Sequence, residues 1–122
     1  MGRQLTKQPT ITSNTRYPSD LRTSDAIDLV VPTAVRVEAG WDRTAPTAAL
    51  INLLRIGDAV LGTPSSDTAA ALVSRHGVSI ADAHIGAVVA SRPETEAVTI
   101  LTSDLKDMRT VSGTRTVTVV RL

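Results

Sequence analysis

The sequence predicts one α/β domain with a mostly parallel sheet flanked by helices, and two observations support this. Short runs of Val, Ile and Leu alternate with longer stretches that carry helix start and stop signals, as expected of strands joined by crossover helices. The 122 residues include one Trp, one Tyr and no Phe, so aliphatic side chains must build the core, as in buried parallel sheets. This length is sufficient for a single domain.

The beginning of the chain shows no sustained periodicity. Residues 1–18 are rich in Thr, Gln, Asn and Pro, and we interpret them as an irregular extension in which residues 10–12 pair at most as a short strand. The domain is expected over residues 19–122, starting with a short helix over residues 19–26 that Ser19 would cap.

The middle of the chain predicts two strands separated by two helices. Residues 29–31 form an apolar, β-branched run, as expected of a buried strand. Thr33 is a candidate N-cap for a helix over residues 34–42. Residues 46–56 predict a second helix with Pro at its start, and residues 58–61 a short strand.

The second half predicts helices and strands in alternation. The helix over residues 80–91, with Ser79 as its cap, is apolar on almost every side and should be buried on most sides. The other expected elements are a helix from Ser65 or Ser66 to the residue before Gly77, a strand over residues 98–101, a short helix to about residue 111 and a strand over residues 117–120.

Charge and composition limit the possible functions. The formal net charge of +1 is too small for nucleic-acid binding by bulk charge, although 13 Lys and Arg residues allow a local basic patch. The absence of Cys excludes disulfides and thiolate metal sites. No apolar run is long enough to cross a membrane and no signal-peptide pattern is present, so we expect a cytoplasmic protein without membrane partners.

Three acidic residues lie where an open parallel sheet would place a site, at or beyond the carboxyl ends of strands, and a fourth follows the last of them by three residues. They are Glu38, Asp82, Asp104 and Asp107. Clustered carboxylates repel one another and a cation relieves the repulsion; ligands made only of oxygen suit Mg²⁺ or Mn²⁺. Because such an ion can activate water and stabilise charge on phosphate, the pattern predicts a metal-dependent nuclease.

The same acids have simpler interpretations. Ser79 with Asp82, and Asp104 with Asp107, have the spacing of a capping box, so each pair can serve only to start a helix. Glu38 alone has the character of a solvated helix residue.

Three stretches together resemble the PIN-domain nuclease family, the VapC-type toxin ribonucleases of bacterial toxin–antitoxin pairs. They are residues 30–35 (VVPTAV) followed by Glu38, residues 81–84 (ADAH) and residues 100–108 (ILTSDLKDM). The resemblance covers about residues 20–122. It implies a metal-dependent endoribonuclease that uses Mg²⁺ or Mn²⁺, cleaves RNA, forms a homodimer and is inhibited by a cognate antitoxin.

The resemblance also assigns roles to residues. It implies that Glu38, Asp82 and Asp104 are catalytic residues and metal ligands, and that Asp107 is a further ligand. Thr102 and Ser103 would position the substrate or the attacking water.

The chain departs from the family at its beginning. PIN domains start with a central strand that ends in an aspartate, and residues 1–28 contain no such pattern. We therefore expect a partial PIN-like α/β/α fold of three layers, with the first strand and helix missing or replaced. Residues 9–13 or a partner chain would supply the strand, or the product is a truncated remnant. The nuclease would be weakened or inactive, and the alternative is a non-catalytic binding module.

Overall fold

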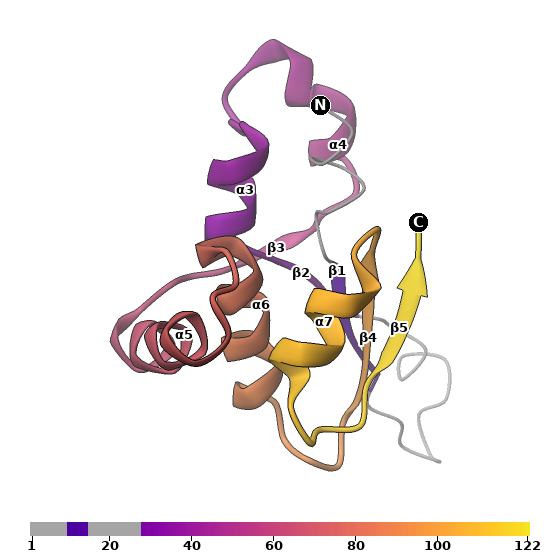
Figure 1. Cartoon of the computed structure of the whole chain (residues 1–122). Helices are drawn as coiled ribbons and strands as arrows, with labels where there is room; N and C mark the ends of the chain where they lie inside the picture. The colour runs from indigo at the N-terminus through magenta and orange to yellow at the C-terminus, as the bar shows by residue number, and fades with distance from the viewer. Residues whose placement is uncertain (1–9, 15–27) are drawn as a thin grey trace.

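A computed structural model describes residues 10–14 and 28–122, and these residues form an α/β fold (Figure 1). The helix predicted over residues 19–26 lies outside the described residues. The strands form one five-stranded sheet in the order β3-β2-β1-β4-β5. Among the described residues, none of the helices has the length and apolar character needed to span a membrane.

The central strand comes from the segment expected to be an irregular extension. β1 (Thr10–Asn14) lies between β2 (Asp28–Pro32) and β4 (Ala97–Thr102) and runs antiparallel to both. The sequence contains no PIN-like first strand, and residues 10–14 form the central strand of this sheet. The prediction of a mostly parallel sheet is wrong at this central position.

The outer strands form two parallel pairs, as predicted. β3 (Gly57–Ala59) pairs with β2, and β5 (Thr118–Arg121) pairs with β4. Because β2 and β4 both run against β1, all four of these strands point the same way. Their carboxyl ends therefore meet at one edge of the sheet, where an α/β fold can build a site.

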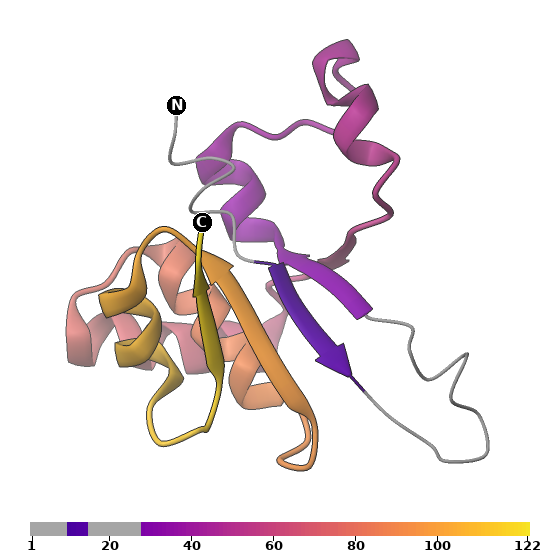
Figure 2. The same cartoon turned by 90° about the vertical axis from the view of Figure 1, so that its right-hand side faces the viewer.

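Three helices lie on one side of the sheet (Figure 2): α6 (Ile80–Ser91) and α7 (Leu105–Ser112) pack against strands, and α5 (Thr63–His76) packs against α6. The central one, α6, has the predicted bounds and the predicted cap, because the Ser79 hydroxyl accepts a hydrogen bond from the Asp82 N–H at 3.1 Å. Residues 81–89 are all buried, which confirms that an apolar helix is covered on every side. A second helical layer, on the other face, remains a prediction.

Close packing of these helices depends on Gly86 in α6. A Cβ atom at Gly86 would lie 2.6 Å from Leu72 Cδ1 of α5 and 2.8 Å from both Val111 Cβ and the Val111 carbonyl oxygen of α7. The missing side chain thus lets both neighbouring helices approach α6. The core around it is aliphatic apart from Met108, and its most buried members include Val31, Ile85, Val89, Ile100 and Met108.

A segment of residues 33–56, which we call the arm, rises from the β2–β3 side of the sheet (Figure 1). It begins with α3 (Thr33–Ala39), which ends three residues earlier than predicted because Gly40 adopts a left-handed conformation (φ 68°) and terminates the helix. The predicted cap at Thr33 is wrong: Pro32 holds the N-cap position and makes no side-chain capping bond.

The second half of the arm differs more from the prediction. One helix was expected over residues 46–56, but the chain forms a 3₁₀ turn, η2 (Pro46–Ala48), and a short helix, α4 (Ala49–Asn52). Arg55 has φ 55°, a left-handed conformation that a helix cannot contain. The chain therefore leaves the helical path before β3.

Candidate metal centre

Three carboxylates meet at the carboxyl edge of the sheet. One side-chain oxygen from each of Asp82, Asp104 and Asp107 lies within 4.8 Å of the other two. Asp82 comes from the first turn of α6 and is completely buried. Asp104 and Asp107 come from the turn after β4 and the first turn of α7, and both are partly buried. We call these three residues the acid cluster.

Local hydrogen bonds fix the turn that carries two of these acids. The Thr102 hydroxyl accepts a hydrogen bond from the Asp104 N–H at 3.0 Å, and Thr102 itself is fully buried. Asp104 Oδ1 accepts from the Asp107 N–H at 3.2 Å and caps α7. Ser79 and Asp104 therefore cap α6 and α7, as one half of each predicted capping box requires, yet Asp82, Asp104 and Asp107 also converge. Ser103, between them, is partly buried, and its role in positioning substrate or water remains a prediction.

The electrostatics of the cluster favour a positive ligand. Burial raises the pKa of Asp107 from 3.8 to about 6, helped by the hydrogen bonds that protonated Asp107 donates to Asp104 and Asp82 and by the charges of these two carboxylates. The causes are desolvation and the proximity of like charges. A proton or a metal ion held between the three carboxylates would relieve both.

The structure brings three of the four predicted ligands together, and Glu38 is not in that group. Glu38 is exposed on α3 and lines an apolar groove of about 500 Å³ whose other walls include Val37, Leu61 and Ile80. Asp107, expected only as an additional ligand, completes the group instead. Its signal in the sequence was the spacing of three residues from Asp104, which places both at the start of one helix.

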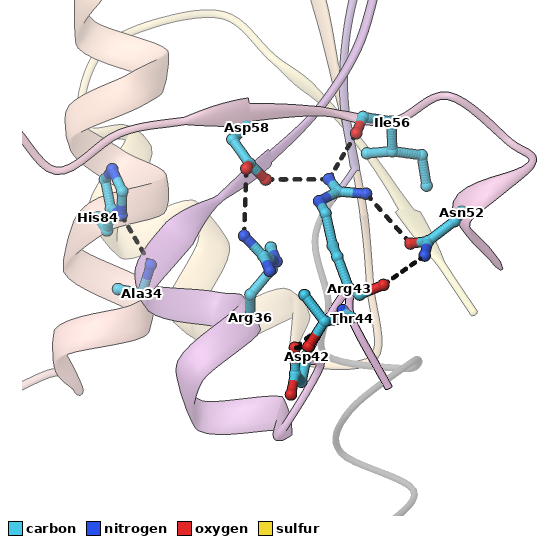
Figure 3. A network of polar contacts seen from close by, with 9 residues as sticks. All are labelled: Ala34, Arg36, Asp42, Arg43, Thr44, Asn52, Ile56, Asp58 and His84. Atoms are coloured by element: carbon cyan, nitrogen blue, oxygen red, sulfur yellow. Dashed lines mark hydrogen bonds and ion pairs between the residues drawn. The ribbon is translucent and has the colours of Figure 1, made fainter. Parts of the chain in front are cut away.

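A buried histidine fixes α3 relative to the acid cluster. His84, two residues after Asp82, is completely buried, and its Nδ1 accepts a hydrogen bond from the Ala34 N–H at 3.2 Å (Figure 3). Burial lowers the pKa of His84, and the nearby Val60 carbonyl only partly opposes this. The ring is therefore neutral near pH 7, as an acceptor nitrogen requires. Nothing in the sequence around His84 indicated this supporting role.

The arm is held on the sheet by polar contacts (Figure 3). Asp58 in β3 accepts from Arg36 Nη1 at 3.1 Å and from Arg43 Nη2 at 2.9 Å. The same Arg43 nitrogen donates to the Ile56 carbonyl at 2.6 Å. The guanidinium of Arg43 also lies 4.4 Å from the centre of the Trp41 ring, within cation–π range. We call the Asp58, Arg36 and Arg43 contacts the clasp.

Comparison with known proteins finds no relative: no family model, no curated protein and no solved structure matches this chain. The function must therefore be inferred from the chemistry of its own residues.

The residues present fit a hard divalent cation. The acid cluster offers oxygen atoms only, which Mg²⁺ and Mn²⁺ prefer. Its atoms are close enough to share one ion, and the backbone N–H of each of its three members donates a hydrogen bond that fixes the residue in place. Protonation of Asp107 competes with such an ion, so binding should strengthen as the pH rises past about 6.

Proposed function

We propose that this protein is a metal-dependent ribonuclease. The observation that carries the proposal is the convergence of Asp82, Asp104 and Asp107 at the carboxyl edge of the sheet. The resemblance of residues 81–84 and 100–108 to VapC-type PIN domains supports RNA as the substrate. On the same basis we propose a PIN-like fold, a cytoplasmic location, a homodimer and inhibition by a cognate antitoxin.

The three acids would hold Mg²⁺ or Mn²⁺, and the ion would supply an activated water and charge stabilisation at the scissile phosphate. Thr102 positions Asp104 through its backbone N–H, and the buried α6 keeps Asp82 in place. Glu38, at the edge of the apolar groove, would act on the substrate rather than in the three-carboxylate group.

The replaced strand explains why we propose weak activity. β1 runs in the reverse direction, and its last residue, Asn14, pairs with Ala97 at the beginning of β4. The carboxyl end of the central strand thus lies at the edge opposite the acid cluster. β1 therefore does not end in an aspartate beside the other acids, as a PIN-like first strand would.

The test is RNA cleavage by the purified chain with Mg²⁺ or Mn²⁺ and with EDTA. Asp82→Asn should reduce metal-dependent cleavage by more than about 100-fold, since loss of a ligand exceeds the 10- to 100-fold effect of an outer-shell change. Asp58→Asn is the matched control, because it removes a carboxylate outside the acid cluster. Cleavage that survives EDTA, or that Asp82→Asn leaves unchanged, would contradict the proposal.

A second candidate is a non-catalytic binding module. Large apolar side chains are exposed on the arm and beside it: Val37, Leu50, Leu53, Leu54 and Ile80. Exposed apolar surface of this kind is typical of protein interaction sites. Stable dimers in light scattering, or tight antitoxin binding, without cleavage under any metal condition would favour this function.

A further inference from the structure

Three basic side chains lie on α7 and β5, the helix and strand that follow the acidic turn, and have no role in the fold described so far. Lys106 and Arg109 are exposed on α7, three residues apart and therefore on neighbouring positions of one helix surface. Arg121 is exposed at the end of β5. We call Lys106, Arg109 and Arg121 the basic rim.

The register of the sheet places Arg121 next to the acidic turn. Arg121 pairs with Thr102, and the following N–H, of Leu122, donates to the Thr102 carbonyl at 3.0 Å. Val119, two residues earlier, pairs with the buried Ile100 and packs against the core. Since alternate strand residues share a face, Arg121 lies on the face that α7 covers.

No ion pair of the basic rim is found in the part of the chain that the structure describes. Within residues 10–14 and 28–122, the ion pairs of the arginines involve Arg36, Arg43 and Arg92, while none includes a member of the basic rim. Three exposed positive charges thus face solvent on α7 and β5, the elements that adjoin the turn carrying Asp104. An RNA strand approaching the acid cluster meets repulsion there, and a net charge of +1 offers little compensation elsewhere.

We propose that Lys106 and Arg121, assisted by Arg109, bind a backbone phosphate of single-stranded RNA next to the phosphate held at the acid cluster. This inference rests on the proposed ribonuclease function. Phosphate contacts from Lys and Arg supply sequence-independent affinity and fix the register of a strand. The basic rim would thereby direct the strand along the α7–β5 side of the site.

The experiment measures binding separately from cleavage. A short fluorescein-labelled single-stranded RNA is titrated with the full chain in EDTA over a range of salt concentrations, with fluorescence anisotropy as the readout. Lys106→Gln and Arg121→Gln should each weaken binding by up to about fivefold. Each should also reduce the slope of log affinity against log salt by about 0.7, the value for one contact to a single strand.

Two controls define the outcome. Arg121→Lys should retain the wild-type slope, because it keeps the charge. Arg75→Gln removes an exposed charge from α5, on the far side of α6 from α7, and should leave the slope unchanged. The inference would be overturned if all variants had the same slope, if Arg75→Gln reduced the slope as much as Lys106→Gln and Arg121→Gln do, or if the protein did not bind RNA. Binding that follows the basic rim without any metal-dependent cleavage would overturn the ribonuclease proposal alone.

Discussion

The acid cluster and the clasp use the same kind of side chain in opposite ways. Asp58 has a side chain that is one-third exposed and lies between two arginines, at 2.9 and 3.1 Å. Asp107 lies beside two other carboxylates, which together with burial raise its pKa to about 6. A carboxylate that forms ion pairs with two arginines, as Asp58 does, helps to hold the arm in place. A carboxylate whose pKa is raised by burial and by neighbouring carboxylates, such as Asp107, opposes stability when it is ionised, and such sites are candidates for function.

The supports beneath the two sites also differ. The acid cluster stands on α6, which is buried along its length and packed against α5 and α7 at Gly86. The clasp holds an arm whose leucines, Leu50, Leu53 and Leu54, remain exposed. Apolar packing therefore surrounds the helix of the candidate site, whereas the arm combines a few core side chains, including Val35 and Ile56, with the polar contacts of the clasp. The following changes test this division, beginning with the largest expected effect.

Gly86→Ala should destabilise the protein by about 1–3 kcal/mol, the usual cost of overpacking. The new Cβ would meet the Val111 backbone oxygen at 2.8 Å, which cannot move without displacing α7. This cost exceeds the gain of about 1 kcal/mol from improved helix propensity. Urea unfolding measures the difference. Gly62→Ala, where no atom lies within 4 Å, is the control and should lose less than about 1 kcal/mol. Wild-type stability in Gly86→Ala would show that α6 is not tightly packed.

Stability should depend on pH through Asp107. Its folded-state pKa, about 6, lies above the ordinary value of 3.8, so the folded protein binds the proton more tightly. This contribution is fully present below about pH 3.8 and is lost as the pH rises through about 6. The urea concentration at the unfolding midpoint of the wild-type protein should therefore fall as the pH rises through that range. The Asp107→Asn variant should not show this fall. Mg²⁺ should raise the wild-type midpoint above pH 6, and identical pH profiles for the two proteins would contradict the assignment.

Arg43→Gln should loosen the arm at a cost of about 1 kcal/mol, because partly exposed ion pairs contribute little. Trp41, which stacks on Arg43, should report the change in its fluorescence. Metal affinity, measured by calorimetry with Mn²⁺, should stay at the wild-type value. A large loss of metal binding would mean that the arm supports the acid cluster after all.

Leu53→Ser should have the smallest effect, within about 0.5 kcal/mol, since Leu53 is 74% exposed. The matched buried change, Ile85→Val in α6, should cost about 0.5–1.5 kcal/mol. If Leu53→Ser destabilises the protein more than Ile85→Val, Leu53 is covered in solution. Repeating the measurement at several protein concentrations would show whether a second copy provides that cover.

Elements defined by local signals could be predicted from the sequence. The Ser79 cap and the continuous apolar stretch after it determine α6 to the residue. The turn from Thr102 to Asp107 likewise forms through bonds between near neighbours. Two of the three members of the acid cluster sit on this turn, and the third follows the Ser79 cap, so the cluster was largely predictable.

Features that depend on distant contacts could not be predicted. The direction of β1 depends on pairing with both β2 and β4, for which residues 10–14 carry no signal. The position of Glu38 depends on how α3 docks, and the His84 contact with Ala34 that fixes α3 joins residues 50 apart. The proximity of Arg121 to the acidic turn likewise appears only once β5 is in register with β4.

The reversed central strand has a consequence for how the chain assembles. β1 is made first, yet one of its two partners, β4, lies near the other end of the sequence. Until β4 has been synthesised, β1 can pair with β2 alone. The other edge of β1 then keeps unpaired backbone groups, which promote aggregation. Closure over so long a loop also slows folding. Within the sheet, β2 and β3, which flank the arm, are joined to β4 and β5, which flank the turn with Asp104 and Asp107, through the five residues of β1.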